Sequence, residues 1–375
     1  MRSVLALATL AVVAVNAAPA PFSSLEHMKR EIIQRMDSNK LNKRQSVTTG
    51  ADDVTILNFA LTLEHLEAKF YADAISRFNA SAFESAGFPG VYDVVKQVGA
   101  DEQAHVEFLT TALSAAGATP VEACNYTFPG AEDVSGFLAL SQVIENVGVS
   151  AYLGAAGSIN NTDYLTAAGS VLTVEARHAA AIQFIHGYQP ASQPMDTPLS
   201  ASNIVTIVSP FFTSCPSGSA PTITGNTALN VTTTAPAINS TLELVPANSS
   251  AIEGQEAVYC GFASGLSSAF SNYTNGACDI PSQNITAGQT YVLLTSGPSL
   301  LADSILAGPA ILSLDVANLT VGPFVGAMAS STSNSISSSA SSTMLSSASS
   351  SVATGVSSIS SAVSSAYASA TASSV

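Results

Sequence analysis

The chain has 375 residues, of which 47 % are hydrophobic and only 10 % are charged. Acidic residues outnumber basic ones by 26 to 11, and seven of the 11 basic residues lie at or before residue 44. The remainder therefore carries four basic and 23 acidic residues, a net charge of −19. Because a chain of this charge repels phosphate groups, we exclude nucleic acid and anionic lipid surfaces as partners.

The first 44 residues contain two sequence patterns that are typical of proteolytic processing. An apolar run follows Arg2 and ends in Val15-Asn16-Ala17, a small-x-small pattern that predicts a signal peptide over residues 1–17. The run is too short to span a bilayer, and no transmembrane helix is predicted. Residues 18–44 end in the dibasic pair Lys43-Arg44 and are predicted to be a propeptide; the alternative is an exposed linker that is not cut. We therefore expect a secreted protein, either extracellular or in the cell wall.

Secretion also explains the cysteines and the N-glycosylation sequons. The four cysteines permit three disulfide connectivities, and none of them has the close spacing of a zinc knuckle; they are Cys124, Cys215, Cys260 and Cys278. Nine Asn-x-Ser/Thr sites lie mostly between predicted elements or in the C-terminal half, where glycans are tolerated. They are Asn79, Asn125, Asn160, Asn230, Asn239, Asn248, Asn272, Asn284 and Asn318.

Beyond residue 44 the composition changes twice. Residues 45–195 have helical periodicity, whereas residues 196–327 are rich in Thr, Val, Ser, Pro and Gly. Residues 328–375 are almost entirely Ser, Ala, Thr and Val, so this tail is predicted to be disordered and to carry O-linked sugars. The sequence thus predicts an α+β multidomain protein: a four-helix bundle, a small β-sandwich and a disordered Ser-rich tail.

Apolar spacing predicts four helices in the first region and several strands in the second. The first helix has an inward face that steps by four and three residues, and Gly117 ends the second. The helices are predicted over about 52–78, 91–116, 132–158 and 162–187, the last with Thr162-Asp163 as its cap. Alternating runs bounded by Gly, Pro or Asn predict strands over 228–233, 240–245, 257–262, 290–295 and 310–316.

Each predicted helix carries a carboxylate on its inward face, where an apolar residue is expected. Glu64 lies on the first helix and Glu145 on the third, while residues 102–105 and 175–178 both have the pattern Glu-x-x-His. At three residues' spacing on a helix, the Glu and His side chains point the same way. Since a buried, unpaired carboxylate costs on the order of several kcal/mol, four of them in one bundle interior require cations.

This arrangement is the one found in dinuclear carboxylate metal sites. Carboxylates suit hard ions, and imidazole favours iron or manganese over calcium. We therefore predict two transition-metal ions, with iron preferred to manganese. The predicted ligands are Glu64, Glu102, His105, Glu145, Glu175 and His178. Small residues beside them leave room for a small oxidant and little more; these are Ala68, Ala104, Gly148, Ala151, Ala176 and Ala179.

The ligands also form an internal repeat. Tyr71 follows Glu64 by seven residues, and Tyr152 follows Glu145 by the same interval. Seven residues make two helical turns, so each tyrosine lies on the ligand face, where its hydroxyl can bind a ligand carboxylate. The alternative is that both tyrosines are core aromatics.

Three further side chains compete for a place in the site. Glu67 is the main rival of Glu64, and the tyrosine spacing repeated at Glu145 favours Glu64. His65 and His186 have no carboxylate at three residues' spacing and are expected at the surface or the rim.

Residues 57–71, LNFALTLEHLEAKFY, resemble the opening helix of fungal secreted ferritin-like proteins. This family is named for stress response and late sexual development and has plant desiccation-related relatives. The similarity continues through residues 101–105, Glu145 and residues 175–178, and covers about 45–325. It implies a ferritin-like bundle with an appended β domain, but no defined reaction, and no ligand position is missing.

The resemblance also bears on the disulfides. The motifs flanking Cys124 and Cys215 occur together in the family pattern, which implies a Cys124–Cys215 bridge. Cys260 and Cys278 lie 18 residues apart in the predicted β domain and are expected to close a local loop.

Three functions are compatible with these features. The first is a dimetal oxidoreductase, ferroxidase-, oxidase- or catalase-like, that acts on dioxygen, peroxide or ferrous iron. The second is an iron-binding protein without turnover. The third is a cell-wall-associated structural glycoprotein that uses the bundle as a scaffold, with wall polysaccharide as its partner. Residues 196–327 contain no His, Lys or Arg, so we expect no catalysis there.

Overall fold

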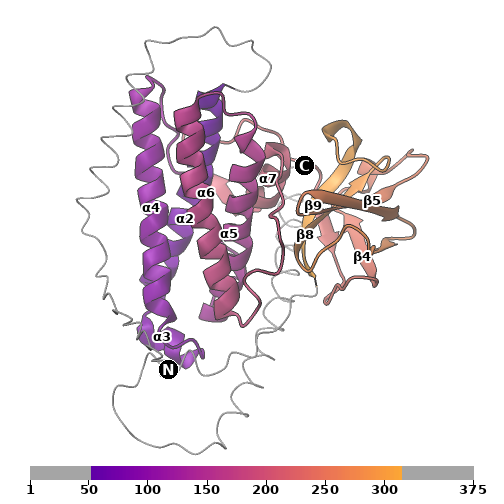
Figure 1. Cartoon of the computed structure of the whole chain (residues 1–375), viewed down its shortest axis with the longest axis horizontal. Coiled ribbons are helices and arrows are strands. Elements are labelled where there is room, and N and C mark those ends of the chain that lie inside the picture. Colours follow the sequence, from indigo (N-terminus) through magenta and orange to yellow (C-terminus); the bar gives the residue numbers. More distant parts are fainter. Residues whose placement is uncertain (1–51, 315–375) are drawn as a thin grey trace, which may run out of the picture. The chain divides into compact units, whose positions relative to one another are not determined.

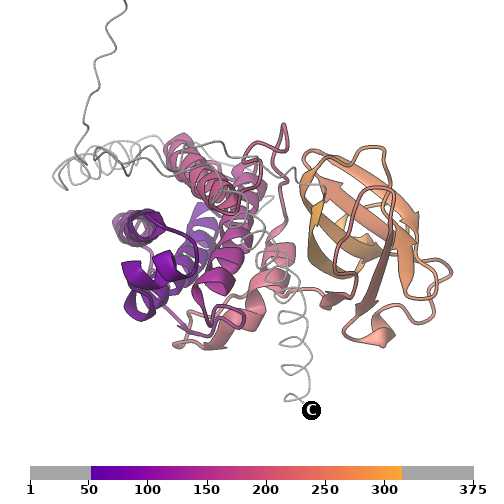
Figure 2. The same cartoon turned by 90° about the horizontal axis from the view of Figure 1, so that it is seen from below.

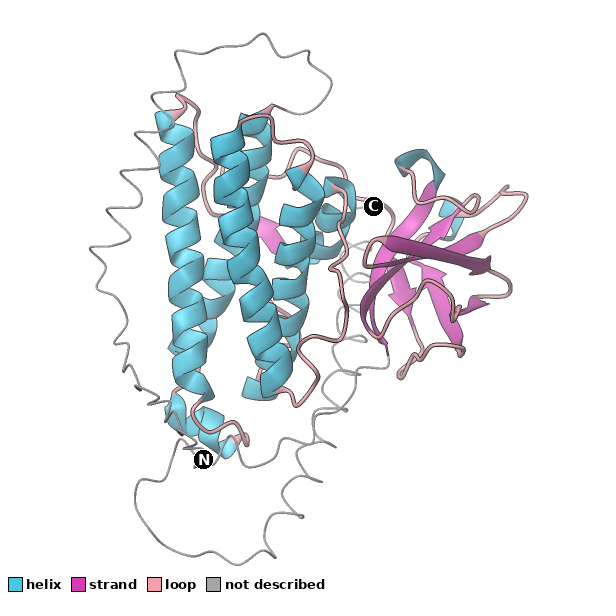
Figure 3. Cartoon of the chain, viewed as in Figure 1, coloured by secondary structure: helices cyan, strands magenta, loops and turns pink. Residues whose placement is uncertain are grey.

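The computed structural model describes residues 52–314. The predicted signal peptide, propeptide and Ser-rich tail, together with Asn318, lie outside the described residues. The described part consists of a helical bundle followed by antiparallel sheets, in agreement with the predicted fold class (Figure 1, Figure 3).

Four long helices form the bundle, and their ends lie within two residues of the predicted ones. They run alongside one another (Figure 1) and are seen nearly end-on in Figure 2. Side-chain oxygens of Asp52, Asp133 and Asn161 accept hydrogen bonds from the first free backbone N–H groups of three of them. Asn161 is thus the cap of the fourth helix, one residue before the predicted cap. The four are α2 (Asp53–Arg77), α4 (Val91–Ala115), α5 (Val134–Ala156) and α6 (Thr162–Ile185).

Helix α5 lies deepest in the bundle. By length and composition it could cross a membrane, but 83 % of its most apolar stretch is buried inside the protein. It also carries Glu145 in its middle, completely buried. Helix α5 is therefore the core helix of the bundle.

Two short helices were not predicted, α3 (Ala80–Ser85) and α7 (Ala201–Val208). Helix α7 is capped by Ser200, and its Ile204, Ile207 and Val208 join the same core as α5. These three residues have helical spacing, but the β-branched composition of the segment favours a strand when it is considered alone. Residues 201–208 are therefore helical, and α7 lies between α5 and strand β9 (Figure 1).

Two sheets enclose a second core. All neighbouring strands are antiparallel, and the sheets have the orders β3-β4-β7 and β6-β5-β8-β9. Five of these strands overlap the predicted runs, whereas β6 and β7 were not predicted. The strands are β3 (Leu229–Val231), β4 (Thr241–Pro246), β5 (Tyr259–Ser264), β6 (Ser267–Asn272), β7 (Ala277–Asp279), β8 (Gly288–Thr295) and β9 (Ile305–Leu314).

The four-stranded sheet is joined to helix α5 by a buried tyrosine. Tyr291 of β8 is fully buried in the helical core, and its hydroxyl lies 2.7 Å from Ser150 Oγ. One turn further along α5, Gly154 lies against the Leu199 carbonyl so closely that any Cβ there would clash with it. The β domain and the α6–α7 connection therefore both fix the position of α5.

The structure contains the two expected disulfides. Cys124–Cys215 lies beside the small sheet formed by β1 (Asn125–Tyr126) and β2 (Phe212–Ser214), so it ties the α4–α5 connection to the segment after α7. Cys260–Cys278 joins β5 to β7, which belong to different sheets. One bridge thus closes the bundle end, and the other closes the sandwich.

Removing the two bridges should destabilise the protein to different extents. The Cys260→Ala/Cys278→Ala variant opens a loop of 18 residues and should lose about 3 kcal/mol of unfolding free energy. The Cys124→Ala/Cys215→Ala variant opens a loop of 91 residues and should lose about 4.5 kcal/mol. Urea unfolding measures both values, and equal losses or the reverse order would contradict this account.

Candidate metal centre

The six predicted ligands come together in the middle of the bundle. All four carboxylates have an exposed fraction of 0 %, and the two imidazoles are 9 % and 6 % exposed. Their ligand atoms form two groups whose members lie within 4.8 Å of one another. Glu102 and Glu175 belong to both groups. The first group adds Glu64 and His105, and the second adds Glu145 and His178.

Both imidazoles present the Nδ1 atom to the carboxylates. His105 Nδ1 lies 3.2 Å from Glu64 Oε2, 3.3 Å from Glu102 Oε2 and 3.3 Å from Glu175 Oε1. His178 Nδ1 lies 2.8 Å from Glu102 Oε1 and 3.4 Å from Glu145 Oε2. Each ring nitrogen therefore lies at a point where two or three carboxylates converge.

Several of these atoms lack a hydrogen-bond partner among the described residues. They are Glu102 Oε1, Glu145 Oε2, both oxygens of Glu175 and His178 Nδ1. Glu102 Oε1 and His178 Nδ1 are close enough for a hydrogen bond but are not aligned for one. A buried polar atom without a partner is costly, and atoms that face a common point fit a cation there. The donor set of carboxylate oxygens and imidazoles suits a transition metal.

The two predicted tyrosines hold ligand carboxylates across the bundle. Tyr71 of α2 donates its hydroxyl hydrogen to Glu145 Oε1 of α5, and Tyr152 of α5 donates to Glu64 Oε1 of α2. Burial, followed by the adjacent carboxylate charge, raises the pKa of both tyrosines well above the usual value. Both hydroxyls therefore remain protonated donors. The two hydrogen bonds are reciprocal, because the tyrosine of each helix binds the glutamate of the other, as the internal repeat of the sequence suggests.

The structure adds Asp101, which the sequence analysis did not single out. Its Oδ2 lies 3.3 Å from His178 Nε2, and its Oδ1 accepts a hydrogen bond from Gln97. A carboxylate on the far nitrogen of a metal-binding imidazole fixes the orientation of the ring. The residue before Glu175 is Val174, which offers no such acceptor to His105, so the two halves of the site differ. In the sequence, the feature that could have drawn attention to Asp101 is its position directly before Glu102.

Glu67 lies beside the two groups and belongs to neither. Its exposed fraction is 3 %, and Oε2 has no hydrogen-bond partner among the described residues. Burial, and then the negative charges of Glu175 and Glu64, raise its pKa well above the usual value. Of the two competing glutamates on α2, the structure therefore places Glu64 within the cluster and Glu67 next to it.

The other two histidines lie outside the cluster. His65 is half-buried, with Nε2 3.1 Å from the Val121 carbonyl oxygen. His186 was expected at the surface or the rim, but this prediction was wrong, because its exposed fraction is 8 %. It caps α6 and packs against the rings of Phe88 and Tyr188. Burial lowers its pKa, so it is a neutral core side chain.

In the metal-free protein, protons partly neutralise the cluster. Burial raises the pKa of Glu102 to about 7, although the adjacent imidazoles of His105 and His178 oppose the shift. Burial alone would lower the pKa of His178, but the nearby carboxylates of Asp101, Glu102 and Glu145 outweigh it and raise the pKa to about 12. The pKa of His105 is raised in the same way by Glu64, Glu102 and Glu175, and that of Glu175 is raised by burial and by Glu102.

The metal-free protein should therefore lose stability as the pH rises. Between pH 4.5 and about 7 the folded state keeps a proton on Glu102 that the unfolded chain has released, which costs about 3 kcal/mol by pH 8. His178 acts in the same direction, because its contribution is complete below pH 6.5 and declines towards pH 12. Urea unfolding at pH 5 and pH 8 measures the difference.

Loading with Mn²⁺ should remove or reverse the loss of stability with rising pH, because bound ions replace the protons and bind more tightly at higher pH.

For the metal-free measurement, Glu102→Gln is the control variant, because it removes the group that titrates near pH 7 and should lose less stability between pH 5 and pH 8. A metal-free wild-type protein that is as stable at pH 8 as at pH 5 would contradict the assigned titrations.

Comparison with known proteins agrees with this geometry. Residues 52–187 match a family model described as "Ferritin-like domain". No curated protein matches the chain. The matched residues contain the four long helices and all six residues of the cluster. The helical part of this protein thus has the fold of a ferritin-like domain, and its buried Glu/His cluster can hold metal ions.

Proposed function

We propose that this protein is a secreted dinuclear metalloprotein that binds iron, or alternatively manganese, and acts as an oxidoreductase on dioxygen, peroxide or ferrous iron. The observation that supports it is the convergence of four fully buried carboxylates and two imidazoles with unpaired oxygen and nitrogen atoms. Four carboxylates offset the charge of two divalent ions. The filled site is then nearly neutral.

The two overlapping groups suggest how the ligands would be divided. Glu102 and Glu175 belong to both groups and are suited to bridge two ions. Glu64 and His105 would complete one ion site, and Glu145 and His178 the other. Bound iron or manganese would supply one-electron chemistry. The tyrosines hold the oxygens of Glu64 and Glu145, and Asp101 orients His178, so the ligands are positioned before the metal arrives.

The proposed compartment rests on separate observations. Two disulfides in the described part indicate an oxidising environment. The signal-peptide pattern at residues 1–17 supports secretion. Seven of the eight sequon asparagines within the described residues are exposed, and the eighth, Asn230, is half-buried. The resemblance to fungal secreted ferritin-like proteins supports a role in stress response or development.

Two other functions remain candidates. An iron-binding protein without turnover would use the same cluster. A structural glycoprotein of the cell wall would need only the bundle as a scaffold, and the Ser-rich region 328–375 and the sequons favour this function. The buried cluster favours a metal function, because four carboxylates in the core would only destabilise a purely structural scaffold.

The first test is the metal content. Purified protein loaded with ferrous iron or Mn²⁺ should bind about two ions per chain. The Glu102→Ala/His105→Ala variant should bind none, because it removes a bridging carboxylate and one imidazole. Equilibrium dialysis with elemental analysis measures the stoichiometry.

The matched control is the Asp93→Ala/Lys96→Ala variant. It removes a charged pair with the same three-residue spacing on the same helix, but both side chains are exposed. This variant should keep the full metal content. If the cluster variant binds as much metal as the control, the metal assignment is wrong.

The second test is turnover. Two ferrous ions can give two electrons to one dioxygen molecule, which takes up two protons and becomes hydrogen peroxide. We expect dioxygen consumption when ferrous iron is added anaerobically and air is then admitted, or peroxide breakdown when manganese is bound. An oxygen electrode measures both. Loaded protein that does neither would favour the binding or structural function.

A further inference from the structure

The two ligand groups of the cluster differ in how their histidines are held. We call the group that contains Glu64 and His105 the His105 position, and the group that contains Glu145 and His178 the His178 position. The two bridging glutamates belong to both positions and do not distinguish them. A difference in metal affinity between the positions must therefore come from the other ligands and from the groups that orient them.

His178 is held at both nitrogens of its ring. Its Nδ1 lies against the ligand carboxylates, and Asp101 Oδ2 lies 3.3 Å from Nε2. Asp101 Oδ1 in turn accepts a hydrogen bond of 2.9 Å from Gln97, one turn earlier on α4. An Nε2–H that donates to a carboxylate leaves Nδ1 free to bind a metal ion, fixes the ring and makes it a stronger ligand.

His105 has no such support. The hydrogen-bond contacts that the described residues make with its ring both involve Nδ1. In the internal repeat, Val174 is the residue of α6 that corresponds to Asp101 of α4, because each directly precedes a Glu-x-x-His pattern. An aliphatic side chain cannot accept a hydrogen bond. The far nitrogen of His105 therefore has no carboxylate that would orient the ring.

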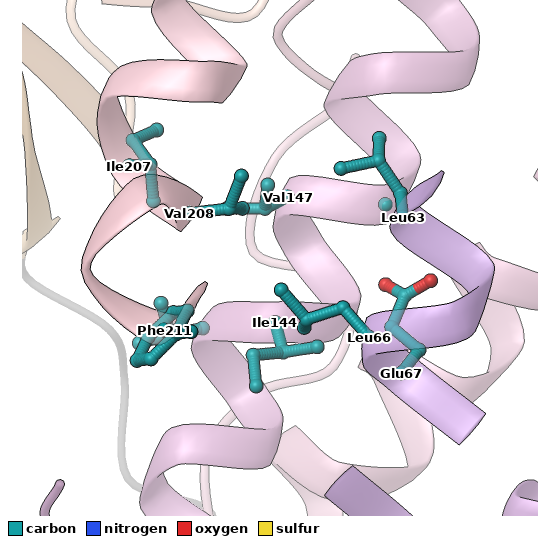
Figure 4. A pocket seen from close by; sticks show the side chains of 10 residues that line it. Leu63, Leu66, Glu67, Ile144, Val147, Ile207, Val208 and Phe211 are labelled. Carbon is teal, nitrogen blue, oxygen red and sulfur yellow. The ribbon is translucent and has the colours of Figure 1, made fainter. Parts of the chain in front are cut away.

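Glu67 is a further buried carboxyl group beside the cluster, but it selects neither position. A Cβ at Gly148 would lie 2.8 Å from Glu67 Oε1 and 2.9 Å from Glu175 Oε2, so both carboxyl groups approach the same point on α5. Glu67 lines an apolar pocket between α2, α5 and α7 (Figure 4), and it belongs to neither ligand group. Its neighbour Glu175 is shared by both positions, so any effect of Glu67 through this ligand acts on both.

We propose that the two positions are not equivalent: the His178 position binds the first metal ion and the His105 position the second, with Asp101 as the positioning residue that sets this order. This inference rests on the proposed function and adds an order of loading to it. Loss of a carboxylate partner of this kind costs about 10- to 100-fold in metal affinity. We therefore expect the first ion to bind at least about tenfold more tightly than the second.

Zn²⁺ is the probe, because it is diamagnetic and binds both carboxylate oxygens and imidazole nitrogens. The metal-free full chain, with ¹⁵N-labelled histidine, would be titrated with Zn²⁺ while NMR records the imidazole nitrogen shifts. At one equivalent, His178 should show at least about three quarters of its full change and His105 at most about one quarter, as a tenfold difference in affinity requires. His65 and His186 lie outside the cluster and should not respond.

Replacement of Asp101 tests the cause of the order. Asp101→Val gives α4 the residue that α6 has at the corresponding position. The two histidines should then shift in parallel, and the first binding constant, measured by calorimetry, should fall about 10- to 100-fold. Asp101→Asn keeps an oxygen acceptor and should restore most of the preference for His178. Asp93→Val removes an exposed carboxylate from the same helix and should leave the order and the affinities unchanged.

The outcomes separate this inference from the proposed function. Equal shifts at His105 and His178 in the wild-type chain, or a first ion at His105, overturn the order of loading but leave a two-metal site. A preference for His178 that persists in Asp101→Val overturns the role of Asp101. If neither histidine responds to Zn²⁺, the metal site is wrong and both proposals fail. Ordered loading of a protein without turnover would contradict only the oxidoreductase function.

Discussion

The constraint on which this structure depends is the mutual repulsion of four carboxylates buried in one bundle interior. Glu64, Glu102, Glu145 and Glu175 are each completely buried, and no lysine or arginine is paired with them in the described part of the chain. Two imidazoles and two tyrosine hydroxyls satisfy only part of their oxygens. Such a cluster is costly unless cations occupy it, so bound cations would stabilise the folded state.

The rest of the molecule holds the helices that carry these groups. Tyr291 from β8 and the Leu199 backbone both contact α5, which contributes Glu145, Gly148 and Tyr152 to the site. The Cys124–Cys215 bridge ties the α4–α5 connection to the segment after α7. The β domain contains no His, Lys or Arg, and Tyr291 is its contact with the helix that carries Glu145.

Much of this could be predicted from the sequence, because long amphipathic helices and Glu-x-x-His patterns depend on local spacing. The places where prediction failed depend on tertiary contacts. The segment at α7 has a β-branched composition and becomes helical because Ile204 and Val208 pack on α5. His186 is buried by Phe88, which is far away in the sequence, and by Tyr188, which follows the end of α6. The pairing of Asp101 with His178 spans 77 residues, and the Asp-Glu pair at 101–102 does not show which histidine Asp101 contacts.

The most direct test of the central claim is a crystal structure of iron-loaded protein with anomalous data collected at the iron absorption edge. The account predicts two anomalous peaks inside the bundle, both in contact with Glu102 and Glu175. One peak should also contact Glu64 and His105, and the other Glu145 and His178. A folded bundle with no peak among these six residues, or with peaks only at surface carboxylates, would contradict it.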